Sequence, residues 1–149
     1  MINRLVVLTI TLSLLACGVW AQGDGPAGLW RSVDDHSGES RALVRIFERD
    51  GALYGRVEKI FDPAKAAAVC EKCSGDRHGK KVQGLDIIRG LRADGDGGWS
   101  GGEILDPETG DTYRASVRVT DEGRKLVVRG SILGGLIGRS QTWLRADSK

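Results

Sequence analysis

The sequence predicts an all-β protein: an eight-stranded antiparallel up-and-down barrel that follows an N-terminal signal peptide. Three observations support this fold class, namely short runs of alternating apolar residues, turn residues between those runs, and 22 glycines among 149 residues. Eight is also the strand number at which an antiparallel meander closes around a small interior. A two-sheet sandwich is the alternative, but it usually needs longer crossover connections than these turns provide.

The N-terminal segment, residues 1–21, has the pattern of a signal peptide. Arg4 precedes an apolar run from Leu5 to Cys17, which is shorter than the ~20 residues of a membrane-spanning helix. Cleavage after Ala21 leaves residues 22–149 as one domain, periplasmic or secreted, without a spanning segment. Leu14-Leu15-Ala16-Cys17 also resembles a lipobox, so a lipoprotein anchored in the membrane through an acylated Cys17 is the alternative.

The expected strands are separated by residues that favour turns. Asp50-Gly51 is a hairpin signal, and the segments 94–98, 106–110 and 121–123 have turn chemistry. No segment has the period of a long amphipathic helix, although the alanine-rich residues 64–69 suit one or two helical turns. The expected strands are 29–33, 42–48, 53–61, 84–92, 99–105, 112–119, 125–131 and 139–145.

Charge and motifs argue against several function classes. The formal net charge is only +2, too small for the basic field that nucleic-acid binding needs. The serines lack a nucleophile elbow, and no helix follows the glycine clusters to bind a phosphate, so we expect no catalytic serine and no cofactor. A metal-dependent or hydrolytic envelope enzyme is an alternative, with Asp34, Asp35, His36 and His78 as its loop residues.

Two cysteines remain once Cys17 is assigned to the signal segment, and they form the motif Cys70-x-x-Cys73. In an exported chain, a structural disulfide is the favoured interpretation of such a pair. A metal site is the first alternative, because His78 and His36 would complete a set of four ligands. A redox centre is the second, but redox motifs of this kind open a helix, whereas this one lies between strands.

Six motifs follow one another along the chain: Gly28-Leu29-Trp30, the cysteine segment 70–77, and the segments 84–91, 99–113, 128–130 and 138–143. In this order they resemble the bacterial secreted proteins called domain of unknown function 2147. The resemblance covers nearly all of the domain and implies a lipocalin-like barrel, in agreement with the strand count. It implies no activity and no catalytic residues.

Gly28-x-Trp30 also resembles the start of lipocalin barrels, in which the tryptophan plugs the closed end and a late arginine stacks across it. In an eight-stranded meander, the first and last strands are antiparallel neighbours, so the end of the last meets the start of the first. Trp30 and Arg145 occupy these two positions. We therefore expect a cation–π contact between them at the closed end of the barrel.

The other end of the barrel is the expected place of function. The connections at 34–41, 62–83, 106–110 and 132–137 gather there, and the second is long enough to act as a lid. The fourth is apolar between glycines, which is unusual for a solvated loop. A protein-binding module that docks through this Ile132–Ile137 loop is therefore one alternative function.

Alternation along the strands predicts the residues of a binding site. It places Arg89 beside Leu91, and Glu103 beside Leu105, on the apolar faces of their strands. Gln141 shares a face with Trp143 in the same way. We therefore expect a non-enzymatic, exported ligand-binding or envelope accessory protein. Its small, partly polar ligand would contact Arg89, Glu103 and Gln141 beneath the cysteine loop.

Overall fold

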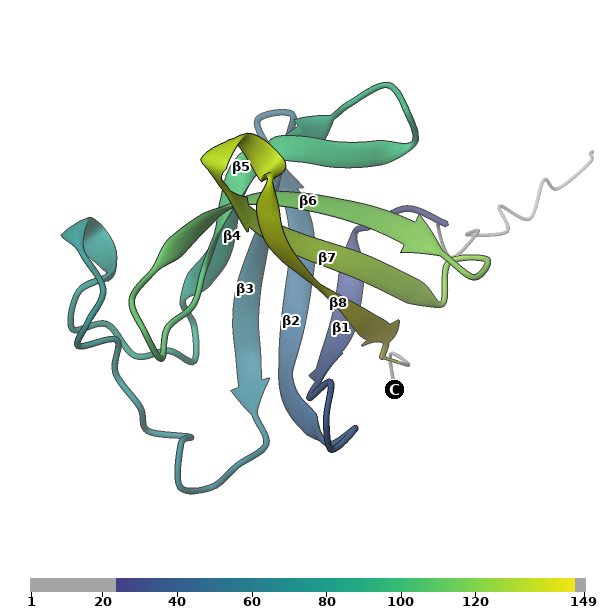
Figure 1. Ribbon diagram of the computed structural model, residues 1–149. Coiled ribbons are helices and arrows are strands. Elements are labelled where there is room, and N and C mark those ends of the chain that lie inside the picture. The colour runs from purple at the N-terminus through teal and green to yellow at the C-terminus, as the bar shows by residue number, and fades with distance from the viewer. Residues whose placement is uncertain (1–23, 147–149) are drawn as a thin grey trace, which may run out of the picture.

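Eight antiparallel strands form one closed barrel in the computed structural model, which describes residues 24–146 (Figure 1). Each strand pairs with its neighbours along the chain, and the last strand closes the barrel against the first. The predicted fold class is confirmed and the sandwich is excluded, whereas the signal-peptide and Cys17 predictions lie outside the described residues. The strands are β1 (Gly28–Val33), β2 (Ser40–Arg49), β3 (Ala52–Ile60), β4 (Asp86–Ala93), β5 (Gly98–Leu105), β6 (Thr112–Thr120), β7 (Lys125–Ile132) and β8 (Ile137–Arg145).

Local sequence explains the hairpins. Asp50 and Gly51 both have positive φ, 53° and 71°, as the tight turn of a right-twisted hairpin requires. Residues 64–69 form turns but no helix, and the helical segments of residues 24–146 are two short 3₁₀ turns, η1 (Gly75–Arg77) and η2 (Leu133–Gly135). Within the same residues, no helix is long and apolar enough to cross a membrane.

The barrel is sealed at the end where β1 begins. Trp30 is fully buried, and its indole nitrogen donates a hydrogen bond to the carbonyl of Pro26 at 2.8 Å. The guanidinium carbon of Arg145 lies 4.1 Å from the centroid of the Trp30 ring, the contact that the sequence predicts. Arg145 also donates to the carbonyls of Gly123, Ala27 and Gly25. Burial lowers the pKa of this guanidinium, which is partly removed from water.

Two glycines interrupt the alternation of side chains in β4 and β5. Gly90 and Gly101 have φ of 77° and 81°, in the left-handed region that favours glycine. Between the pairs Arg89–Glu103 and Arg92–Ser100, β4 has one residue more than the part of β3 that it faces. In the same stretch, β5 has one residue more than the part of β6 that it faces. Side chains therefore change faces at these two points.

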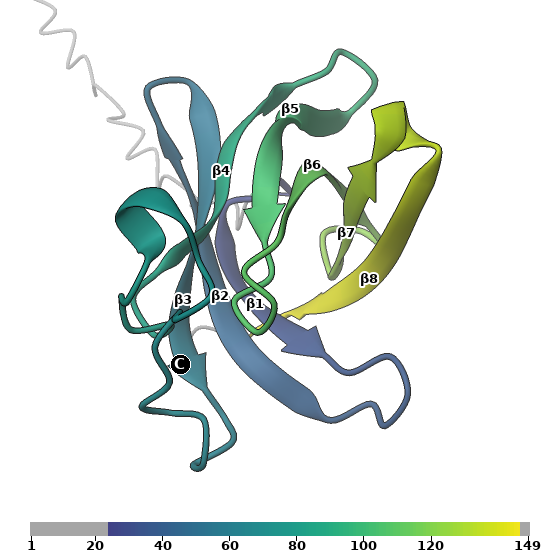
Figure 2. The ribbon, with the colours of Figure 1, turned by 60° about the vertical axis from the view of Figure 1, so that its left-hand side comes forward.

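The long connection between β3 and β4 covers the outside of the sheet as well as one side of the barrel mouth. It contains a disulfide between Cys70 and Cys73, both buried, and the 3₁₀ turn η1 (Figure 2). Val82 and Leu85 of this segment join the same apolar cluster as Ile87 of β4. Ile87 and Ile88 are both buried although they are consecutive, and the β3–β4 ladder shifts register at this point, between the pairs Gly55–Ile88 and Arg56–Asp86.

Candidate ligand-binding site

A cavity of about 1050 Å³ opens at the end of the barrel opposite Trp30. Residues from all four expected connections line it, including Asp34, Lys65, Pro107 and Ile132. The four connections therefore gather at one mouth, as the up-and-down topology requires. The volume is in the range of small-molecule sites.

Apolar side chains form the inner part of the cavity. Val44, Val57, Val128 and Trp143 line it, and each is at least nine-tenths buried. Gln141 is the half-buried polar residue among them, and its side-chain oxygen accepts a hydrogen bond from the Trp143 indole at 3.3 Å. Its amide nitrogen has no hydrogen-bond partner within residues 24–146, so it can donate to a ligand. The predicted position of Gln141 inside the barrel agrees with the structure.

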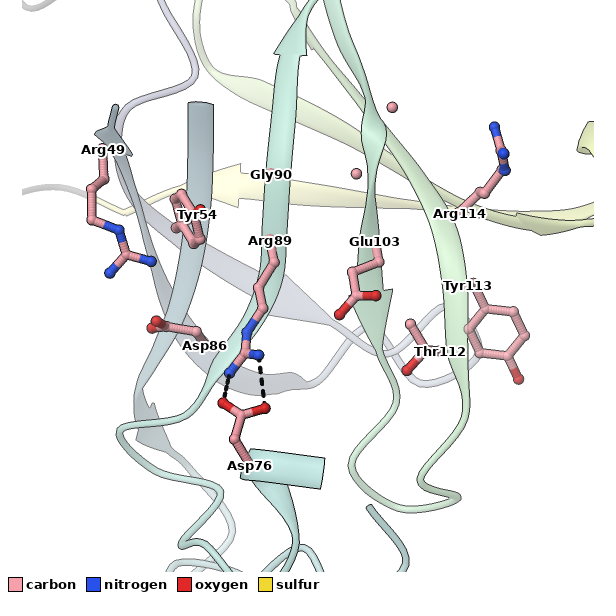
Figure 3. Close-up of a pocket in the computed structure, with 12 residues that line it drawn as sticks. Arg49, Tyr54, Asp76, Asp86, Arg89, Gly90, Glu103, Thr112, Tyr113 and Arg114 are labelled. Atoms are coloured by element: carbon pink, nitrogen blue, oxygen red, sulfur yellow. Dashed lines mark hydrogen bonds and ion pairs between the residues drawn. The ribbon is translucent and has the colours of Figure 1, made fainter. Parts of the chain in front are cut away.

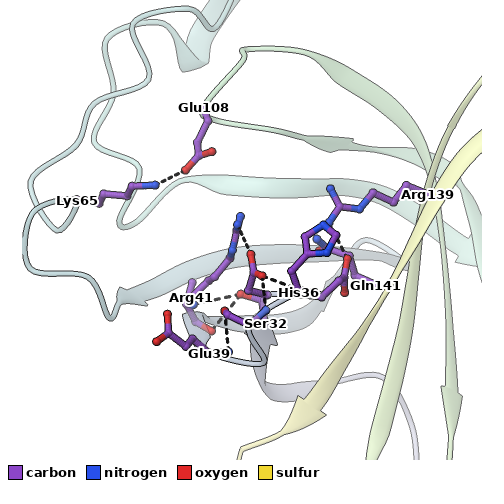
Figure 4. A network of polar contacts seen from close by, with 12 residues as sticks. Ser32, His36, Glu39, Arg41, Lys65, Glu108, Arg139 and Gln141 are labelled. Atoms are coloured by element: carbon purple, nitrogen blue, oxygen red, sulfur yellow. Dashed lines mark hydrogen bonds and ion pairs between the residues drawn. The ribbon is translucent and has the colours of Figure 1, made fainter.

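Three ion pairs surround the mouth (Figure 4). Lys65 of the long connection contacts Glu108 of the β5–β6 turn at 2.6 Å, and Arg139 of β8 contacts Asp35 of the β1–β2 turn at 2.6 Å. The hydrogen bond from Lys65 lowers the pKa of the Glu108 carboxyl. Two of these pairs thus join separate connections across the rim.

The third pair joins Arg41 and Asp34 within the β1–β2 hairpin. The Asp34 carboxylate also accepts hydrogen bonds from the backbone nitrogens of Ser37 and His36, both at 2.9 Å. These backbone bonds, with Arg41, lower the pKa of Asp34 far below its usual range. Such a carboxylate stays ionised and organises a turn, which makes it a poor general acid or base.

The alternative metal set is not assembled. Cys70 and Cys73 are joined to each other, and the Nδ1 atom of His78 lies 2.9 Å from the carbonyl oxygen of Cys73. His36 is an exposed residue of the β1–β2 turn at the mouth. Among the described residues, no group of three or more His, Cys, Asp or Glu is arranged to hold a metal ion. The structure therefore contradicts the shared site of Cys70, Cys73, His78 and His36.

Arg89 and Glu103 lie on the outside of the barrel, so their predicted inward orientation is wrong (Figure 3). Both line an open groove of about 910 Å³ on the outer face, whose lining shares Tyr113 with that of the internal cavity. The glycine bulges are the first reason, because Gly90 lies between Arg89 and Leu91 and turns these two side chains to opposite faces. The second reason is the long connection, which brings Asp76 and Arg77 to the outer face, where they pair with Arg89 and Glu103.

On that outer face, both residues bind the 3₁₀ turn of the long connection. Arg89 donates two hydrogen bonds to Asp76, at 2.8 and 3.0 Å. Glu103 accepts one from Arg77 at 2.7 Å, and Arg77 is only 8% exposed. The hydrogen bond from Arg89 lowers the pKa of Asp76. These contacts hold the turn against β4 and β5, so the pair positions the loop on the outside of the barrel.

Sequence reasoning missed other residues of the cavity. Ile104 and Tyr113 line it, and they are paired across β5 and β6. The available signal was the glycine at 101 inside a predicted strand, which is compatible with a bulge. Its positive φ, seen only in the structure, is what reverses the faces of β5 and places Ile104 inside.

A closed antiparallel barrel with one sealed end, and a largely apolar cavity open at the other, is the architecture of a lipocalin-like protein. The solved structure of protein HP1028 from Helicobacter pylori, described as belonging to the lipocalin family, is similar in fold. The TM-score is 0.69 at 21% identity, and the match covers 81% of this chain and 82% of that one.

The chain belongs to the family described as "Uncharacterized protein conserved in bacteria (DUF2147)", whose model matches residues 28–145. This match confirms the family resemblance of the sequence motifs. Comparison with curated proteins gave no significant match.

Proposed function

We propose that this protein is exported from the cytoplasm and binds a small ligand with an apolar body and one polar group inside the barrel. The observation that carries the proposal is the cavity of about 1050 Å³, which is walled by aliphatic side chains and Trp143. Apolar walls favour a ligand whose transfer from water is itself favourable. Gln141 supplies a hydrogen-bonding group beside the apolar side chains of the inner wall, which gives the ligand an orientation.

The sealed end supports the same function. Trp30 and Arg145 close that end with a buried ring and a set of backbone hydrogen bonds. A ligand would therefore enter and leave through the mouth, past the ion pairs of the rim. Those exposed pairs contribute little stability, so their exchange with water does not prevent entry.

The test is a titration with Nile red, an apolar probe whose fluorescence rises when it leaves water. Val128→Phe places a ring in the cavity and should weaken probe binding at least about tenfold, because the added volume occupies the site. Val127→Phe is the matched control, since adjacent strand residues face opposite sides of the sheet. Urea unfolding of both variants separates a filled cavity from a disrupted fold.

Equal probe binding by the wild type and a folded Val128→Phe variant would contradict a site inside the barrel. Native mass spectrometry of the protein purified from an expressing bacterium's envelope fraction provides an independent measurement. A co-purifying small molecule that the variant lacks would support the proposal. The intact mass in the same spectrum shows how the N-terminus was processed. It therefore tests export with cleavage after Ala21 against acylation of Cys17.

A further inference from the structure

The β7–β8 connection exposes a cluster of aliphatic side chains at the cavity mouth. Leu136 is 87% exposed and Leu133 is 67% exposed, with Ile137 at 57% and Ile132 at 42%. Single exposed aliphatic residues are common on protein surfaces, but four within six residues form a patch that water disfavours. We call residues 132–137 the apolar tip.

Backbone geometry keeps the apolar tip extended from the barrel. Leu133 has a φ of 52°, in the left-handed region that glycine, which lacks a Cβ atom, adopts far more readily than leucine. Gly134 and Gly135 follow with φ of 67° and 93°, and nothing lies within 4 Å of a side chain built at either position. The high exposure of Leu133 and Leu136 shows that the tip is not packed on the barrel.

The tip has an arginine on its outer side and is open to the cavity on the other. Arg129 donates a hydrogen bond to the Gly135 carbonyl at 3.3 Å. Arg139, which follows the tip in β8, lines the cavity and is paired with Asp35. Residues 131–138 contain no charged side chain. Ile132 and Ile137 belong both to the tip and to the lining of the cavity. An apolar surface thus continues from the tip into the barrel.

We infer that the apolar tip docks on an anionic lipid bilayer, with Leu133 and Leu136 inserted among the acyl chains and Arg129 at the phosphates. This inference builds on the proposed function, since a docked mouth would pass an apolar ligand between membrane and barrel without exposing it to water. A bilayer fits the tip better than a folded partner does. Protein interfaces use ~20–30 residues a side and favour aromatic groups, whereas insertion into fluid lipid needs only a protruding apolar group.

The experiment is co-sedimentation with vesicles of phosphatidylglycerol and phosphatidylcholine. Every protein carries Cys17→Ser, so that no acyl chain can cause binding. The double variant Leu133→Ser/Leu136→Ser should reduce the partition constant at least about tenfold, because two side chains lose their transfer into lipid. Leu144→Ser is the matched control, as Leu144 is 39% exposed and lies in β8 beside Arg145 at the sealed end.

Wild-type binding that weakens in pure phosphatidylcholine and with the double variant, but not with Leu144→Ser, supports the inference. Three results would overturn it: no binding to vesicles of either composition, equal binding by the double variant, or a wild-type dimer that the double variant abolishes. The last would assign the tip to a second copy of the chain. Nile red titration of the same proteins keeps the two proposals separate, since Leu133→Ser/Leu136→Ser leaves the inner cavity intact.

Discussion

The two ends of the barrel are stabilised by different kinds of interaction. At the sealed end, Trp30 is fully buried, and Arg145 contacts its ring while donating hydrogen bonds to backbone carbonyls. At the mouth, ion pairs join separate connections across the rim, such as Lys65–Glu108, in which both partners are more than half exposed. Buried contacts to backbone groups contribute far more to folding than exposed ion pairs do. The fold thus depends on the sealed end, and the mouth can change without unfolding the barrel.

The largest expected effect is that of removing the Trp30 side chain. Trp30→Ala should reduce the free energy of unfolding by ~3–5 kcal/mol, because it leaves a large cavity under Arg145. Urea denaturation followed by circular dichroism measures the loss. Leu144→Ala, at the same end but exposed, should change the midpoint little. A Trp30→Ala midpoint equal to that of the wild type would contradict the role of the sealed end.

Arg145 is expected to have the next largest effect. Arg145→Ala removes the cation–π contact and the hydrogen bonds to Gly25, Ala27 and Gly123, and should cost ~2 kcal/mol. Arg139→Ala, which breaks an exposed pair at the mouth, is the comparison and should cost under ~1 kcal/mol. Equal losses of unfolding free energy for Arg145→Ala and Arg139→Ala, measured by urea denaturation, would contradict the difference between the two ends.

The disulfide should matter less than the sealed end, because only two residues separate its cysteines. Closing so short a loop restricts the unfolded chain modestly, so Cys70→Ala/Cys73→Ala should lose no more than ~2 kcal/mol of unfolding free energy. Thiol labelling of the denatured, unreduced Cys17→Ser protein should detect no free cysteine. Two labelled thiols would show that Cys70 and Cys73 are not joined in the protein as purified.

The smallest expected effect is an acid-dependent change at the mouth. Lys65 lowers the pKa of Glu108 from its ordinary 4.5, so their ion pair stabilises the fold above that pH and is lost as the pH falls through the lowered value. NMR titration of the Glu108 carboxyl carbon should give a midpoint below 4.5. Lys65→Met should raise this midpoint, whereas Lys125→Met, at the other end of the barrel, should not. An unchanged midpoint in Lys65→Met would refute the pairing.

Local chemistry made the barrel predictable from the sequence. Turn residues such as Asp50-Gly51 and the two-residue alternation of Tyr113–Val119 are properties of a few adjacent residues, and they fixed strand order and the sealed end. The orientation of Arg89 and Glu103 depended on two bulges, and a glycine within a strand does not announce which conformation it adopts. It also depended on the long connection, whose Asp76 and Arg77 pair with Arg89 and Glu103 on the outer face, a contact between distant segments that local alternation does not predict.

The two bulges have a consequence for related sequences. Gly90 in β4 and Gly101 in β5 each add one residue between the pairs Arg89–Glu103 and Arg92–Ser100. The two additions offset each other, so β4 and β5 keep the same pairing register on both sides of the bulges. A chain that lost one of these residues would shift every later rung and turn its side chains to the wrong face. A chain that lost both would keep the ladder and the orientation of Arg89 and Glu103. In an alignment of the family, deletions at these two positions should therefore occur together, as one coupled event.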